Sequence, residues 1–233
     1  MLDIKTDFIE KEYLLYRHNE KVIQCNLCPR LSNYINQIGR IKVKRFIDKD
    51  YWAKPLPSFG DTKAKLLIIG LAPAAHGGNR TGRMFTGDSS GDWVAKAMFE
   101  NGFANMPTSQ SRNDGFALKD AYITAVVRCA PPFNKPNPSE ILNCSQHLIT
   151  ELKILDKTIK VILTLGKIAF NAFCRINNLN GLTFYHGAFY SIANNKTLLV
   201  SYHPSRQNTN TGKLTWQMWM DIFRAARSII RRK

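Results

Sequence analysis

The residues best suited to chemistry lie in one glycine-rich segment, residues 66–88, with the sequence LLIIGLAPAAHGGNRTGRMFTGD. Its first four residues are apolar and predict a short buried strand. Small residues follow, and they let the backbone approach a flat ligand closely. Open α/β sheets bind ligands where a strand ends in such a loop, so we expect the site here. Six side chains in the segment could hold or orient a ring: His76, Asn79, Arg80, Arg83, Phe85 and Asp88.

Four of the five cysteines form the second chemically promising group. Cys25 and Cys28 make a C-x-x-C pair followed by proline, whereas Cys129 and Cys144 are well separated. Zinc prefers two close pairs or a Cys/His mixture, while a [4Fe–4S] cluster takes four thiolates. The residues alone leave open a cluster, a zinc ion or unliganded buried thiols. Cys174 lies in an apolar helical segment and is interpreted as core packing.

The charge of the chain points to a polyanionic partner. Among 233 residues, 33 Lys and Arg stand against 17 Asp and Glu, a net charge of +16. Such an excess is typical of nucleic-acid-binding domains, although it does not separate DNA from RNA or from an anionic membrane surface. The N-terminus lacks a signal-peptide pattern and no apolar run reaches the length of a membrane span, so we expect an intracellular protein.

The elements that must position these residues alternate along the chain. Short apolar runs predict four strands, at residues 66–69, 121–127, 159–165 and 197–201. Helical spacing is found at residues 6–24, 89–102, 138–155, 166–174 and 214–231. This alternation indicates one α/β domain with a parallel sheet. The first helix is expected to bury an apolar face made by Phe8, Ile9, Tyr13, Leu14 and Ile23.

Three motifs together resemble the family 5 uracil-DNA glycosylases: GLAPAAHGGNRTGRMFTGD (70–88), RCAPPFNKPNP (128–138) and YHPSRQNTNTG (202–212). The resemblance runs from about residue 20 to the end. It implies a three-layer α/β/α sandwich with a four-stranded parallel sheet, as one domain over residues 1–233 with the N-terminal helix and C-x-x-C (1–30) packed on it. It also implies a structural [4Fe–4S] cluster, because the related family 4 enzymes share the cysteine plan. The ligands would be Cys25, Cys28, Cys129 and Cys144.

The implied activity is removal of uracil from DNA by hydrolysis of the N-glycosidic bond, which leaves an abasic site for base excision repair. A glycosylase must first take its base out of the stack. By the resemblance, the ring of Phe85 stacks on the base and His203 donates to the charge that develops on the leaving uracil. Backbone N–H groups of the Gly70–Ala74 segment, with Gly70, Ala72, Pro73 and Ala74 lining the base, would add to this stabilisation.

Two departures from related families bear on the chemistry. The acid or amide that other families place just after the first glycine is replaced by Leu71 and Ala72, so Asn79 is the first candidate to orient water, followed by Asp88 and His76. The asparagine with which family 4 reads the base edge is Ala125 here. Looser discrimination, with hypoxanthine or other deaminated bases as substrates, is the expected consequence.

Contacts to DNA are expected from the loop of residues 204–212 and from nearby basic side chains. By analogy with the family, this loop enters the minor groove, and Arg206 fills the gap left by the flipped base. The full set of expected DNA contacts is Arg80, Arg83, Lys135, Ser205, Arg206, Gln207 and Lys213. We expect a monomer that acts on double- or single-stranded uracil-containing DNA, in the cytoplasm beside the nucleoid, with no membrane partner.

Two other functions compete with the glycosylase. A non-catalytic, cluster-stabilised nucleic-acid-binding protein would explain the missing acid at Leu71 and Ala72, although His203, Asn79 and Phe85 count against it. A redox protein using the cluster is disfavoured by the positive charge and by the lack of a flavin or nicotinamide motif.

Overall fold

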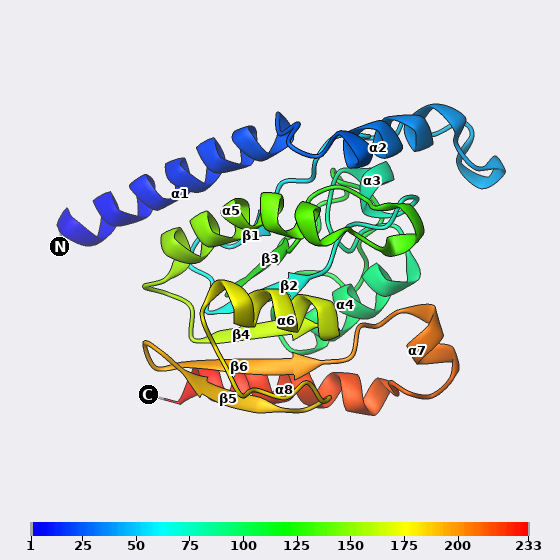
Figure 1. The fold of residues 1–233 in the computed structure, drawn as a ribbon. Coiled ribbons are helices and arrows are strands. Elements are labelled where there is room, and N and C mark those ends of the chain that lie inside the picture. The colour runs from blue at the N-terminus through cyan, green and yellow to red at the C-terminus, as the bar shows by residue number, and fades with distance from the viewer. Residues whose placement is uncertain (1, 233) are drawn as a thin grey trace.

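The computed structural model describes the backbone of residues 2–232 and the side chains of residues 9–232. Its centre is a six-stranded sheet with the strand order β1-β3-β2-β4-β6-β5 (Figure 1). The four inner strands are parallel, and the two edge strands run antiparallel to their neighbours. The bounds are β1 Phe59–Gly60, β2 Leu66–Gly70, β3 Ala121–Ala125, β4 Val161–Leu165, β5 Phe189–Ile192 and β6 Lys196–Ser201.

The α/β class and all four predicted parallel strands are confirmed, with ends shifted by at most two residues. The strand count is wrong, because the sheet is mixed and has six strands. The two additional strands are short, and β5 alternates between exposed and half-buried residues. They lack the continuous apolar run that marks the inner strands, which are buried on both faces.

Helices cover both faces of the sheet, so the fold has three layers (Figure 1). One face packs against α4 (Ser89–Glu100) and α8 (Trp216–Arg231). The other packs against α1 (Leu2–Ile23), α2 (Pro29–Ile41), α5 (Pro138–Leu155) and α6 (Lys167–Ile176). No described helix combines the length and apolarity that a membrane crossing needs.

The apolar face predicted for the first helix is wrong in orientation. Ile9, Tyr13 and Leu14 are exposed, and Phe8 lies outside the described side chains. The buried side of α1 is instead made by Lys11, Leu15, His18 and Val22. Polar contacts hold this side to the core, including the Asn19 side chain, whose amide donates to the Ser58 carbonyl at 3.1 Å. A helix anchored partly through polar groups does not show its buried face in its hydrophobic pattern.

The parallel register brings the ends of the inner strands together. Gly70 at the end of β2 pairs with Ala125 at the end of β3, and β4 and β6 end beside them at Leu165 and Ser201. Gly70 lies two residues beyond Ile68, and alternation along the strand therefore places it on the face covered by α4 and α8. The site loop leaves β2 at this edge, where ligands bind in open α/β sheets.

Candidate active site

A pair of aromatic rings stands at the strand ends. The ring centroids of Phe85 and His203 are 5.9 Å apart and tilted by 32°. Phe85 lies directly against Gly70, where an added Cβ would be 2.9 Å from the Phe85 ring. Gly166, just after β4, lies beside His203: a Cβ added there would be 3.5 Å from that of His203, an ordinary van der Waals contact. Gly70 thus leaves the space that the Phe85 ring fills, and the structure brings the predicted Phe85 and His203 together.

His203 is held as a neutral ring. Burial lowers the pKa of its imidazole to about 4. Neither ring nitrogen bonds to another residue in the described part of the chain, whereas the His203 carbonyl accepts from Asn208 Nδ2 and from the Ser205 N–H, both at 2.8 Å. The backbone of His203 is therefore fixed while a ring N–H is left to donate.

The backbone after β2 offers further donors. The N–H groups of Ala72 and Ala74 donate to no other described residue, and Pro73 between them has none to give. Ala125 is 1% exposed and packs in the same apolar cluster as Phe85. An alanine there supplies volume and no hydrogen-bonding group.

Asp88, three residues after Phe85, caps helix α4. Its Oδ1 accepts from the Gly91 N–H at 2.9 Å at the start of α4. The carboxylate also lies against Gly77, where an added Cβ would be 1.9 Å from Oδ2. Burial raises the pKa of Asp88, opposed by the hydrogen bond from Gly91. The glycine loop thus folds directly onto a desolvated carboxylate.

Asn79 is not placed to contact a water at the site, so the prediction that its side chain orients the attacking water is wrong. Its side chain is fully buried in α3 (Gly78–Thr81), where Nδ2 donates to the Ile35 carbonyl of α2 at 3.4 Å. Its Oδ1 is buried without a partner among the described residues. Asn79 therefore joins the site loop to α2.

His76 faces a residue that the sequence did not single out. Its Nδ1 lies 3.0 Å from the Tyr51 hydroxyl, and burial together with Arg45 and Arg80 lowers the pKa of its ring. Because Tyr51 belongs to a loop distant in sequence, only the fold could reveal this pair.

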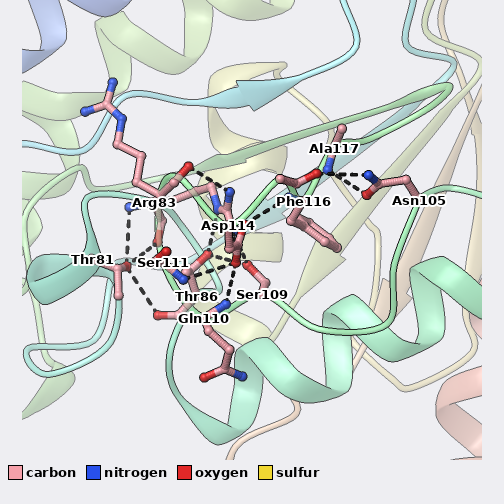
Figure 2. Close-up of polar contacts among 12 residues, drawn as sticks. Thr81, Arg83, Thr86, Asn105, Ser109, Gln110, Ser111, Asp114, Phe116 and Ala117 are labelled. Carbon is pink, nitrogen blue, oxygen red and sulfur yellow. Dashed lines mark hydrogen bonds and ion pairs between the residues drawn. The ribbon is translucent and has the colours of Figure 1, made fainter.

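Arg83 is a structural brace, so its prediction as a phosphate contact is wrong (Figure 2). The side chain is 7% exposed, and its Nη2 donates to both carboxylate oxygens of Asp114 at 2.8 and 2.9 Å. Nε donates to Thr86 Oγ1 at 3.0 Å, and Nη2 also donates to Ser109 Oγ at 2.8 Å. The pair ties the site loop to the loop of residues 105–117, and it leaves Arg83 with no exposed charge for DNA.

Arg80 is also largely engaged inside the loop. Its Nε donates to the His76 carbonyl and its Nη2 to the Gly87 carbonyl, both at 2.9 Å. The guanidinium lies 4.0 Å from the ring centroid of Phe46. Arg80 thus joins two backbone carbonyls within the glycine-rich loop. Only its Nη1 is left to contact a phosphate.

The other predicted DNA contacts are exposed to solvent, except Ser205, which caps a short helix. Residues 204–212 are not a plain loop, because Ser205 caps the short helix α7 (Arg206–Asn210). Arg206 is exposed and donates from Nε to Ser89 Oγ at 3.1 Å. Lys213 lies 4.9 Å from the Tyr202 ring centroid. Gln207, Lys135 and Lys213 are exposed.

The four predicted ligand cysteines line one cavity of about 20 Å³, on the face of the sheet opposite Phe85. All are free thiols, and burial raises the pKa of Cys144 to about 11. No group of three or more His, Cys, Asp or Glu in the described chain is arranged to hold one metal ion. A cluster binds one thiolate per iron and spaces its ligands more widely than one zinc ion does, so the donor set suits a cluster better.

A buried ion pair next to Cys129 was also missed. Arg128, 1% exposed, donates to Glu151 of α5 and to Ser58, and Thr124 Oγ1 donates to Glu151 Oε2 at 2.6 Å. Nothing in the sequence indicated that Arg128 and Glu151 pair, because the two residues are 23 positions apart on different elements. The same loop carries Phe133, which is 89% exposed at a positive φ of 56°.

Comparison with known proteins places the chain in a class and then in a family. The model of the Uracil DNA glycosylase superfamily matches residues 57–226, and the chain belongs to that superfamily. Within it the chain belongs with the type-5 uracil-DNA glycosylases. It is 42% identical to those of Mycobacterium tuberculosis (over 91% of this chain and 80% of the relative) and Thermus thermophilus (88% and 93%). A type-4 uracil-DNA glycosylase of Thermotoga maritima is 23% identical over 96% of this chain. The predicted family is confirmed.

Proposed function

We propose that this protein excises uracil from DNA by hydrolysing the N-glycosidic bond and leaves an abasic site for repair. The observation that carries the proposal is the Phe85–His203 ring pair above Gly70 at the carboxyl ends of the strands. Membership of the superfamily agrees with this chemistry. The net charge of +16 suits a DNA substrate.

In this mechanism a flipped uracil stacks on Phe85. Bond cleavage builds negative charge on the departing base, and the neutral His203 ring donates an N–H to its oxygen. The unpartnered N–H groups of Ala72 and Ala74 are further donors near the strand end. Donors that are fixed before the reaction stabilise the developing charge without reorganising, which is the largest contribution expected here.

Asp88 is the proposed group on the water side. The fully buried Asn79 cannot reach a water at the sugar, whereas Asp88 is half-buried beside Gly77. A raised pKa moves a carboxylate toward the range of an effective general base. Asp88→Asn keeps the capping oxygen and removes the charge, so it should slow excision while leaving the stability of α4 nearly unchanged.

Substrate range is proposed to include hypoxanthine, because Ala125 offers no polar group to read the base edge. The test compares single-turnover excision of uracil and hypoxanthine by the wild type and by Ala125→Asn. Adding the amide should raise the preference for uracil about tenfold or more, since a polar group left unpaired by the wrong base rejects it. Equal preference in both proteins would contradict this role.

We further propose that Cys25, Cys28, Cys129 and Cys144 hold a [4Fe–4S] cluster. Bound there, the cluster would link α1, α2, the loop after β3 and α5 as a structural cross-link. Cys174→Ser is a matched control, because Cys174 lies apart from this cavity on α6. Iron and sulfide analysis should find about four of each per chain in the wild type and in the control, but not in Cys144→Ser. Zinc in their place would overturn the proposal.

The activity test uses a labelled duplex with one uracil opposite guanine, followed by cleavage of abasic sites with hot alkali. A cut strand supports excision by the protein, which we expect to act as a monomer. Salt-dependent DNA binding without product would leave the non-catalytic binding protein as the better account.

A further inference from the structure

Helix α2 exposes a stripe of hydrogen-bonding side chains that the active site does not use. Leu31 and Ile35 form its buried side, and Asn33, Asn36, Gln37 and Arg40 are exposed. The spacing of three and four residues places these four on one face. Together with Ile41 they line a shallow, open hollow of about 320 Å³. We call these four residues the α2 stripe.

Helix α2 lies next to the site, and it carries the α2 stripe on its solvent side. Asn79 of α3 bonds to the Ile35 carbonyl, so α2 rests on the loop that carries Phe85 and Asp88. Gly39 packs closely against the following segment, where an added Cβ would be 2.7 Å from Ala53. Figure 1 shows α2 beside α3 and α7 at the opposite side of the same end of the molecule. Asn208 of α7 bonds to the His203 carbonyl, so α7 borders the site as well as α2.

The charge of this region matches a phosphate backbone. No Asp or Glu occurs from Pro29 to Ile47, whereas this stretch holds five cations. Arg30 pairs with Glu140 at 2.7 Å and Lys42 lies 3.9 Å from Asp50. Arg40, Lys44 and Arg45 form no ion pair in the described part of the chain and carry the charge available to a phosphate backbone. The helix of 13 residues is about 20 Å long, which matches about six base pairs of DNA. Asn, Gln and Arg side chains commonly bind the sugar–phosphate backbone and fix register without reading sequence.

Another basic hollow is larger but is wrongly placed. Arg224, Arg227, Arg231 and Arg232 line an open hollow of about 710 Å³ together with Glu100. It lies at the last turns of α4 and α8, whereas both helices begin at the site edge. Two of its arginines are already paired, Arg224 with Asp221 and Arg227 with Asp120. It therefore supplies matched control residues.

We propose that the α2 stripe and the basic segment that follows it dock the duplex on one side of the damaged base. The proposal rests on the proposed function for its substrate, and it assigns α2 the role of holding the flanking phosphates. It predicts that affinity grows with duplex length on one flank of the uracil, up to about six base pairs. The chemistry at Phe85 and His203 is not altered by this contact.

The test compares Asn36→Ala/Gln37→Ala/Arg40→Ala with Ser228→Ala/Arg231→Ala. Each variant loses one positive charge, and all five positions are exposed. Duplexes carry one uracil and flanks of three to twelve base pairs on either side. The α2 variant should bind long duplexes about tenfold more weakly, lose the gain from one flank, and keep its single-turnover rate at saturation. Arg40→Ala alone should lower the salt slope by about one unit, since one phosphate contact is lost.

The outcomes separate this inference from the proposed function. Equal weakening by the α2 variant and the control, or equal loss on single-stranded DNA, would overturn the docking role. Wild-type protein that excises nothing, yet binds with flank dependence removed by the α2 variant, would sink the activity and keep the docking surface.

Discussion

Replacing Asp114 with asparagine tests whether Arg83 is a brace of the site loop. Asp114 accepts two bonds from Arg83 and also bonds from the N–H groups of Phe116, Gln110 and Ser111 (Figure 2). Burial acts to raise the pKa of its carboxyl, but these bonds outweigh it and lower the pKa from 3.8 to about 2.

The magnitude follows from that shift. Lowering the carboxyl pKa from 3.8 to about 2 corresponds to about 2 kcal/mol of stability at pH 7. Removing one partner of a buried ion pair costs about 3–5 kcal/mol when the other charge is left unpaired. Asparagine keeps one acceptor for the backbone N–H groups, so we expect Asp114→Asn to lose about 2–4 kcal/mol.

The pH dependence has a defined sign. A depressed carboxylate pKa stabilises the fold above the unfolded value near 3.8, and this stabilisation is lost as the pH falls toward about 2. The difference between wild type and Asp114→Asn should therefore be full at pH 7 and about half as large at pH 3.

Urea denaturation at both pH values measures these differences, and DNA binding at several salt concentrations supplies the second readout. Lys213→Ala, an exposed cation, should lower the salt slope by about one with unchanged stability. Asp114→Asn should lower the stability and leave the salt slope unchanged. Stability within about 0.5 kcal/mol of wild type would refute the brace.

Three further predictions follow from the site. Gly77→Ala should push the Asp88 carboxylate off its cap, lowering the free energy of unfolding by about 1–2 kcal/mol and slowing excision; unchanged activity in the alkali assay would argue against Asp88. The pKa of His203, measured by NMR, should be about 4. The free energy of unfolding should therefore decrease as the pH falls from 6.5 toward 4, because the unfolded chain binds the proton first. A pKa above 6 would contradict the desolvated ring. Phe133→Gly should leave stability unchanged or raise it by up to about 1 kcal/mol in thermal unfolding, because an exposed side chain is removed from a left-handed position; a clear loss would show hidden packing.

Much of the fold could be predicted because its inner strands and most helices carry strong local signals. The ends of the helix predicted at residues 138–155 are confirmed, and the structure shows a capping box of Asn137 and Glu140 at its start. Helix α2 was missed although Leu31, Ile35 and Ile38 recur at helical spacing and Pro29 marks its first turn. This signal was available in the sequence, and only a side-chain cap is lacking. The edge strands were missed because they are too short to show a pattern.

The site was predictable where residue type and strand end coincide, as at Gly70 and His203. It was not predictable where side-chain direction decides the role. Asn79 and Arg83 sit in a polar, glycine-rich stretch that suggests solvent, yet both point inward to partners 44 and 31 residues away. Sequence spacing does not encode such contacts, because they depend on how loops pack after the strands are in place.

The most direct test of the central claim is the single-turnover rate of His203→Ala on a duplex with one uracil opposite guanine. Loss of a fixed donor to the leaving base should slow excision by about 10²–10³-fold while DNA affinity stays within about twofold. A rate within about threefold of wild type would contradict the assignment of His203, and with it the account of how this site cleaves the bond.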